Sequence, residues 1–346
     1  MSFRKPYIKK LAKSFAIFIA LSGLCLNVYS QAVGDYRTTA SGNWNTVANW
    51  QRWNGAAWAA PGANGYPGQT AGAGTVTIRN NHNVTLNVSP AFNIAALTID
   101  PGANATTLTF GAFTLNVTGD VNVNSTSNNV TKSIALNTGT LSCNNLYLTS
   151  SGGNDSRDAF VVLTSGTLNV TGNITMNAVA ARTYILFNGG GTVNVSGTIT
   201  GGTITSTAGG GATAPTSGTI VYNNTGAQNV GTYAYFNLGI SGSGNKAIQG
   251  NISVAGTLTL TAGTLTIGAN TLTLSNGANL SYGTGTLTGG ATSNLTIGTG
   301  TAITLNSISG GLNNFNTSRN ITLGADLAVN GTLALTAGIL TIGANT

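Results

Sequence analysis

The sequence predicts an all-β protein, a parallel β-helix (β-solenoid) of about 25–27 residues per coil, and three observations lead to this prediction. Val, Ile and Thr alternate with other residues along most of the chain, which is typical of β-strands. A short motif recurs at nearly constant spacing. No segment after residue 31 has a long apolar stripe of helical period, so we expect almost no helix.

The recurring motif is T-φ-x-φ, in which φ is apolar. It begins at six threonines, whose sequence numbers increase by 29, 26, 27, 25 and 27: Thr85, Thr114, Thr140, Thr167, Thr192 and Thr219. Within a step we find three short strand-like segments, separated by Gly, Asn and Ser, which is the plan of one solenoid coil. Coils of this kind stack about 4.8 Å apart, and each strand pairs with its equivalents above and below.

The alternation within the motif predicts two columns of inward side chains, because the second and fourth residues share a face. The first column would contain Leu86, Leu115, Leu141, Leu168, Val193 and Ile220. The second would contain Val88, Val117, Cys143, Val170, Val195 and Tyr222. Cys143 is the one cysteine after residue 30, so we expect no disulfide within the chain and a buried thiol that replaces a core valine.

The first segment is typical of an export signal. Residues 1–30 combine a basic start with the apolar stretch AIFIALSGLCLNVY, and we expect cleavage near Ser30. The remaining chain then carries eight basic residues against six aspartates and no glutamate, a net charge of +2. This small charge gives no reason to expect nucleic acid as a partner, and we expect no membrane span after cleavage of the signal.

The rest of the chain divides into three regions. Residues 31–74 form a Trp-rich N-terminal cap region, residues 75–250 a β-helix with coils of about 25–29 residues, and residues 251–346 its continuation. In the last region two similar segments begin at Val254 and Val329. Their offset of 75 predicts three coils of about 25. The repeat stops at Thr346 without a capping segment, so we expect a piece of a longer protein.

The four tryptophans of the chain lie within fifteen residues of one another: Trp44, Trp50, Trp53 and Trp58. Two interpretations compete. The rings cover the open end of the solenoid, as a cap must, or they form an exposed platform on which sugars stack. We favour the cap, because every solenoid needs its ends covered.

Three basic residues recur at intervals of 25: Lys132, Arg157 and Arg182. Each precedes the third strand of its coil, so the spacing predicts a stack of cations on one edge. Again two interpretations compete. The charges discourage aggregation beside apolar strands, or they contact an anionic polymer such as an acidic surface polysaccharide. We favour the first.

Catalytic constellations are missing from the sequence. Glycoside hydrolysis needs two carboxylates at a defined separation, and lyases need a base, often with calcium held by several carboxylates. Only Asp155 and Asp158 are close neighbours in sequence, and we interpret them as part of a solvated loop. His82 is the one histidine and is expected in a turn. We therefore expect no catalytic residue, no cofactor, no metal and no enzymatic activity.

Two patterns of polar residues are expected on the outer surface of the solenoid. Asn169 and Asn194 should face outward on neighbouring coils, too close for two glycans. Threonines alternate with leucine near residue 260, a pattern that matches ice-binding solenoids or reflects only the β-preference of Thr: Thr257, Thr259, Thr261, Thr264 and Thr266.

The segment GNWNTVANWQRWNG, with the following VTIRNNHNVTL, resembles the N-terminal region of large secreted surface proteins of Bacteroidetes. The repeats GTLTLTAGTLTIGANTLTL resemble their adhesin-type arrays, and the front is also similar to the start of G8-type domains. The resemblance implies a secreted or cell-surface protein, exported by the type IX system through a C-terminal sorting domain that is not recognised up to residue 346.

We therefore expect a structural or adhesive repeat protein of the bacterial surface, non-catalytic in this region, with surface polysaccharide or other surface components as partners. The alternatives are a β-helix that binds or degrades polysaccharide and an ice-binding, Thr-rich solenoid.

Overall fold

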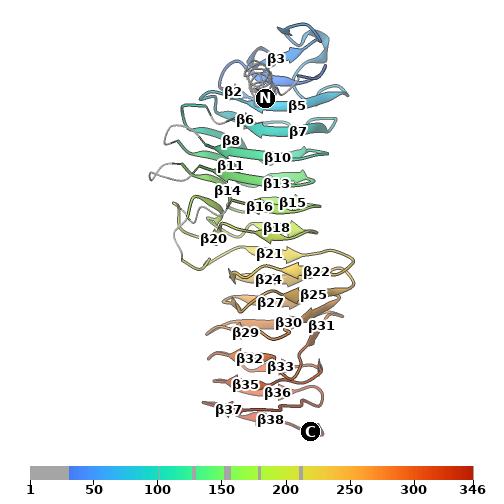
Figure 1. Cartoon of the computed structure of the whole chain (residues 1–346), viewed down its shortest axis with the longest axis vertical. Helices are drawn as coiled ribbons and strands as arrows, with labels where there is room; N and C mark the ends of the chain where they lie inside the picture. The colour runs from blue at the N-terminus through green and yellow to red at the C-terminus, as the bar shows by residue number, and fades with distance from the viewer. Residues whose placement is uncertain are drawn as a thin grey trace, which may run out of the picture.

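The chain forms one long stack of about eleven parallel coils, with its N-terminal and C-terminal parts at opposite ends (Figure 1). The computed structural model describes residues 31–100, 102–126, 130–151, 157–177, 181–209 and 213–345. The predicted signal peptide, residues 1–30, lies outside these residues. The described helices are two 3₁₀ turns, Val47–Asn49 and Gly62–Asn64. The prediction of an all-β solenoid with almost no helix is confirmed.

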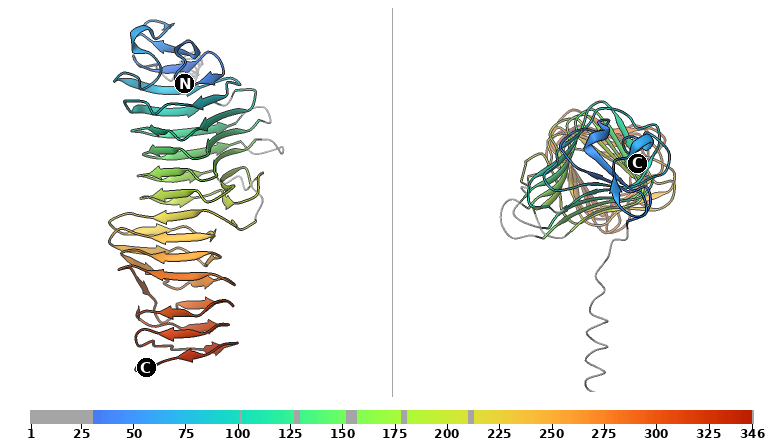
Figure 2. Two further views of the ribbon diagram at one scale, coloured as in Figure 1. Left: turned by 180° about the vertical axis from the view of Figure 1, so that it is seen from behind. Right: turned by 90° about the horizontal axis from the view of Figure 1, so that it is seen from above.

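The first half of the stack has three faces, seen from the other side in Figure 2. Sheet A contains β1 (Tyr36–Thr38), β3 (Trp50–Trp53), β4 (Trp58–Ala59), β5 (Ala73–Ile78), β7 (Ile94–Ile99), β10 (Val121–Ser125), β13 (Leu146–Ser150), β16 (Ile174–Met176) and β19 (Ile199–Thr200). Sheet B contains β2 (Gly42–Asn43), β6 (Val84–Leu86), β8 (Thr106–Phe110), β11 (Lys132–Leu136), β14 (Ala159–Leu163), β17 (Thr183–Phe187) and β20 (Thr203–Thr205).

Sheet C continues from the first half into the second. It contains β9 (Thr114–Asn116), β12 (Thr140–Cys143), β15 (Thr167–Val170), β18 (Thr192–Val195), β21 (Thr219–Tyr222), β24 (Asn237–Ile240), β27 (Thr257–Leu260) and β30 (Asn279–Tyr282). Its strands pair in parallel throughout, which gives one hydrogen-bonded face across the middle of the molecule.

The second half replaces sheets A and B by two new sheets. Sheet D contains β22 (Gln228–Val230), β25 (Asn245–Ile248), β28 (Thr264–Thr266), β31 (Thr286–Thr288) and β34 (Ile308–Ser309). Sheet E contains β23 (Ala234–Tyr235), β26 (Ile252–Val254), β29 (Thr271–Leu274), β32 (Asn294–Ile297), β35 (Asn314–Thr317) and β37 (Leu333–Leu335). A short sheet F follows with β33 (Ile303–Leu305), β36 (Ile321–Leu323) and β38 (Leu340–Thr341).

The core consists of inward columns of aliphatic side chains, as the alternation predicted. Leu141, Leu168 and Val193 pair on successive strands of sheet C, and all are fully buried. Cys143 pairs with Val170 in the second column. The first members were predicted wrongly: Leu86 pairs with Phe110 in sheet B, because the first step of the motif is longer than the coil that contains it. Val88 is only partly buried at the edge of the core.

Coil length is not constant along the stack. On sheet C, Thr192 pairs with Thr219, a step of 27 along the sequence, whereas Thr219 pairs with Asn237, a step of 18. The expectation that the offset of 75 spans three coils is therefore wrong. Leu258 lies in sheet C, but its counterpart Leu333 lies in sheet E, so the two copies occupy different faces. The later coils are short because tight turns separate strands of two to four residues.

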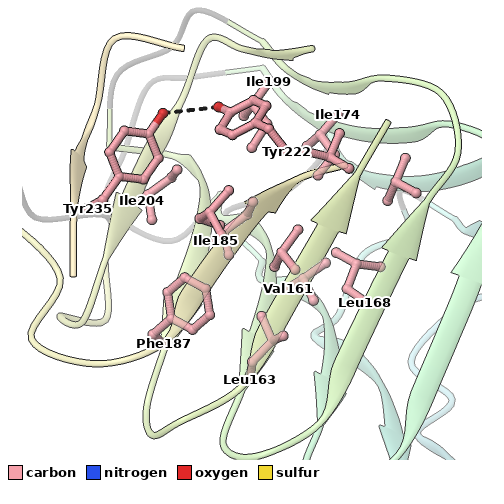
Figure 3. Packing of buried hydrophobic residues seen from close by; sticks show 14 of the residues in the cluster. Val161, Leu163, Leu168, Ile174, Ile185, Phe187, Ile199, Ile204, Tyr222 and Tyr235 are labelled. Atoms are coloured by element: carbon pink, nitrogen blue, oxygen red, sulfur yellow. Dashed lines mark hydrogen bonds between the residues drawn. The ribbon is translucent and has the colours of Figure 1, made fainter. Parts of the chain in front are cut away.

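Tyrosines fill the core where the long coils give way to short ones (Figure 3). Tyr222 follows Val195 in its column, and the larger ring occupies the interior next to Tyr235. The two hydroxyls lie 3.0 Å apart. Gly231 satisfies both, since its N–H donates to Tyr222 at 3.0 Å and its carbonyl accepts from Tyr235 at 2.6 Å. These two buried hydroxyls at the junction between the halves are thus both hydrogen-bonded.

Candidate functional site

A groove lies on the outer face of sheet A, near the N-terminal end. Its volume is about 840 Å³. Residues from β1, β5, β7 and β10 form its floor, and the β3–β4 hairpin contributes Trp58. The side chains that matter for its chemistry are Arg37, Trp58, Asp100, Asp120, Asn122 and Asn124. We call this cavity the sheet A groove.

The four tryptophans divide into two pairs, one buried and one at the groove. Trp44 and Trp50 are almost fully buried, with ring centroids 4.9 Å apart. Their indole N–H groups donate to the carbonyls of Pro67 and Trp44, at 3.0 and 2.8 Å. This pair closes the N-terminal end of the core as a cap. Trp53 and Trp58 face each other across the β3–β4 hairpin, 5.6 Å apart, and both are partly exposed.

Arg37 forms the cationic side of the groove. Its guanidinium lies 4.4 Å from the centre of the Trp58 ring, a cation–π contact, and its Nε donates to Gln51 Oε1 at 2.9 Å. Partial burial, together with the nearby charge of Arg79, lowers the pKa of Arg37 from its ordinary value. These contacts hold the planar head of Arg37 in one orientation at the groove wall.

Two aspartates line the groove, but they do not form a hydrolytic pair. Asp100 follows Ile99, which pairs with Val123, and Asp120 precedes Val121, which pairs with Leu97. They are offset by four residues along neighbouring strands, or about 13 Å at 3.3 Å per residue. The paired carboxylates of glycosidases lie about 5–9.5 Å apart. The two aspartates were not predicted as neighbours from the sequence. The length of the coil that brings Thr98 beside Asn122 also places Asp100 and Asp120 on neighbouring strands.

Asp155 and Asp158 are the two aspartates expected in a solvated loop. Asp155 lies outside the described residues. Asp158 is buried and accepts hydrogen bonds from Arg182 at 3.1 Å and from the Tyr184 hydroxyl at 3.0 Å. The expectation of solvation is therefore wrong for Asp158, since its carboxylate is bound to two side chains of the next coil.

The predicted stack of Lys132, Arg157 and Arg182 does not form. Lys132 pairs with Ala159 and Ala159 with Thr183, so Arg157 and Arg182 fall two and one positions earlier in the register than the lysine. A spacing of 25 did not match these coils, which advance by 27 and then by 24 along the sequence. Lys132 is fully buried, and its Nζ donates to the Asn104 carbonyl and, at 3.0 Å, to Thr106 Oγ1. Burial lowers the pKa of this lysine.

Two further cations are buried in turns of the second half. Lys246 donates to the carbonyls of Asn224 and Ser243, at 2.6 and 2.7 Å. Arg319 reaches five carbonyls of two preceding turns, on Ser275, Ala278, Gly298, Thr299 and Thr301. Such side chains satisfy turn carbonyls that would otherwise be buried without donors, so we assign them a structural role.

Cys143 and His82 occupy structural positions. The Cys143 side chain is 3% exposed, and burial raises the pKa of its thiol to about 12. His82 follows the turn at Asn80 and Asn81, where its Nδ1 lies 2.9 Å from Thr38 Oγ1. Burial and the nearby Arg79 lower the pKa of the imidazole. Neither side chain lines the sheet A groove.

The outward polar faces form hydrogen-bonded ladders. Asn194 Nδ2 donates to Asn169 Oδ1 at 2.8 Å, so these residues stack on neighbouring rungs of sheet C, as predicted. The Thr-x-Thr pattern is short: on sheet C, Thr259 lies between Gly239 and Ser281. On sheet D the pattern covers only the two coils that contain Thr264 and Thr286.

Within the described ranges, no three His, Cys, Asp or Glu side chains lie close enough to hold a metal ion. The helices of the same ranges are too short to cross a membrane. Comparisons of the chain with protein-family models, with curated proteins and with solved structures gave no match.

Proposed function

We propose that this chain is a secreted or cell-surface structural and adhesive protein of a bacterium, a stiff stalk without catalytic activity in this region. The observation that supports the proposal most is the stack itself. About eleven coils stack on one another and are joined by parallel sheets, so the chain extends far in one direction for its mass. A solenoid of this kind serves as a spacer and as a long surface for contacts.

The environment of the acidic residues supports a non-catalytic role. Asp35 accepts from the backbone N–H groups of Ala32 and Thr75, both at 2.8 Å, and Asp158 is bound to Arg182 and Tyr184. Asp120 accepts from Asn145 Nδ2 at 2.9 Å. These carboxylates stabilise turns, and Asp100 has no second carboxylate at hydrolytic separation among the residues that the structure describes.

The sequence supports export. Residues 1–30 have the three-part pattern of a signal peptide, and a solenoid held by backbone ladders needs no disulfide to be stable outside the cell. The polar Thr and Asn ladders also suit a surface that faces water at low net charge.

The location is tested by expressing the full chain, joined at its C-terminal end to a type IX sorting domain, in a bacterium with an outer membrane and a type IX system. We expect mass spectrometry to find a mature N-terminus close to Gln31, and an antibody against the coils to label intact cells. The matched control lacks residues 2–30 and should stay inside the cell. An uncleaved chain that only lysed cells expose to the antibody would contradict the proposal.

A further inference from the structure

Several polar side chains of the sheet A groove have no hydrogen-bond partner among the described residues, in contrast to the ladder in the middle of sheet C. On sheet C, the side chains of Ser142, Asn169 and Asn194 bond to one another. In the groove, the amides of Asn122 and Asn124 make no hydrogen bond to any other described residue, since their neighbours across the strands differ in length and kind. Free amides offer both donors and acceptors to a ligand.

The charged side chains of the groove also have polar atoms without a hydrogen-bond partner among the described residues. The Arg37 guanidinium uses only Nε for its bond to Gln51, so its terminal nitrogens have no hydrogen-bond partner among the described residues. The Asp100 carboxylate likewise accepts no hydrogen bond from them, and burial raises its pKa. Fixed donors and acceptors that already lack protein partners bind a polar ligand at a small cost in ordering.

The groove runs across the coils. Arg37, Thr77, Thr98 and Asn122 pair in one row on four neighbouring strands. Three steps of about 4.8 Å make this row about 14 Å long, enough for a short chain of sugar rings lying parallel to the solenoid axis. Trp58 supplies an apolar wall at the end nearest the cap, where ring C–H groups of a sugar can pack.

The charged side chains that line the groove favour a neutral polysaccharide over an acidic one. Two carboxylates, on Asp100 and Asp120, face the groove against one guanidinium, on Arg37. An acidic polysaccharide would place its own carboxylates near these aspartates, which is unfavourable. A neutral sugar chain offers hydroxyls that donate to Asp100 and accept from Arg37, while the amides do both.

We propose that the sheet A groove binds a neutral oligosaccharide, with Trp58 as its apolar wall and Arg37, Asp100, Asn122 and Asn124 as its hydrogen-bonding groups. Binding depends on these side chains alone and not on where the protein resides. A purified full chain therefore tests the groove separately from the proposed location.

The test measures binding of the purified chain to soluble neutral glycans (β-glucan, mannan, xylan and dextran) and acidic ones (alginate and polygalacturonate) by isothermal titration calorimetry. We expect at least one neutral glycan to bind, with little change between low and high salt. Asn122→Ala and Asp100→Ala should each weaken that binding about tenfold, as loss of one good hydrogen bond does. Trp58→Ala should abolish it.

The matched control is Asn194→Ala, which removes an amide from the sheet C ladder and should bind as the parent does. Asn122→Ala truncates an amide that has no hydrogen-bond partner among the described residues, so it keeps the test valid if Trp58→Ala does not fold. The proposal is overturned if no neutral glycan binds, if the groove variants bind as tightly as the parent, or if an acidic glycan binds in preference with affinity that falls steeply with salt.

Discussion

The thiol of Cys143 occupies a place that valine holds in the next two coils, with Val170 and then Val195 in line with it on sheet C. Its high pKa follows from burial, which disfavours the thiolate, and the negative charge of Asp120 acts in the same direction. Since the thiolate is the reactive form of cysteine, this thiol is unreactive in the folded protein.

Replacement of Cys143 by valine tests this assignment. Cys143→Val should keep the free energy of unfolding within about 1 kcal/mol of the parent, because core changes that preserve volume are tolerated. The measurement is chemical denaturation, paired with labelling of the native thiol by a small maleimide. We expect labelling only after unfolding. Rapid labelling of the native protein would show that the side chain is not in the core.

Lys132 shows what the sequence could not reveal about a single residue. Its interval to Arg157 suggested an outward cation, yet the side chain points inward and binds the Asn104 carbonyl and the Thr106 hydroxyl. Basic residues are so rarely buried that composition argues against such a position. Only the register of β11 with β8 places Lys132 opposite Thr106, and the spacing of the motif does not fix that register.

The strands that carry the T-φ-x-φ motif are the ones whose pairing the sequence predicted best. The T-φ-x-φ segments from Thr114 to Thr219 fall in register on sheet C, because each side-chain column must stay inward over a shared core. The motif at Thr85 belongs to sheet B instead. Alternation shows which side chains of a strand point into the core, but it does not show which of the three sheets the strand joins.

The second half was harder to predict for the same reason. Strands there have near-identical sequences on different faces, such as TLTL at Thr257 on sheet C and TLTL at Thr271 on sheet E. An internal repeat therefore does not mark a whole number of coils. The groove was missed as well, since its residues lie on separate strands far apart in the sequence and carry no motif of their own.

Arg319 connects three successive coils, which gives a prediction for the strands around it. Arg319→Leu should remove the guanidinium donor from five carbonyls, of which those of Ser275 and Thr299 keep a backbone N–H donor. The surrounding coils should lose about 3 kcal/mol or more of stability, at about 1–3 kcal/mol for each buried group left unsatisfied. Arg319→Lys should cost less, because three ammonium donors can replace some of the bonds.

Hydrogen exchange is the appropriate measurement, because each coil of a solenoid depends mainly on its neighbours. In Arg319→Leu, amides of β29, β32 and β35 should exchange faster than in the parent, while those of β10 to β18 keep their protection. Equal protection of the two proteins in the second half would mean that the guanidinium bonds contribute nothing to stability.

As a whole, the described chain is one long stack of coils with a groove near its N-terminal end. Trp44 and Trp50 close the core, and the β3–β4 hairpin carries Trp58 from the same cap to the groove wall. Trp44 and Trp50 are buried at the N-terminal end of the core. The second pair lies at the surface, where a ligand can reach Trp58.

The proposed supporting and binding roles predict that the protein does not cleave glycans, and an assay of glycan cleavage tests this prediction. The purified full chain is incubated with pectin, alginate and the neutral glycans, and reducing ends and unsaturated products are measured over time. We predict none, because Asp100 and Asp120 are about 13 Å apart along their strands and the other described carboxylates on this half are bound in turns. Steady release of products that Asp100→Asn or Asp120→Asn abolishes would contradict a non-catalytic role.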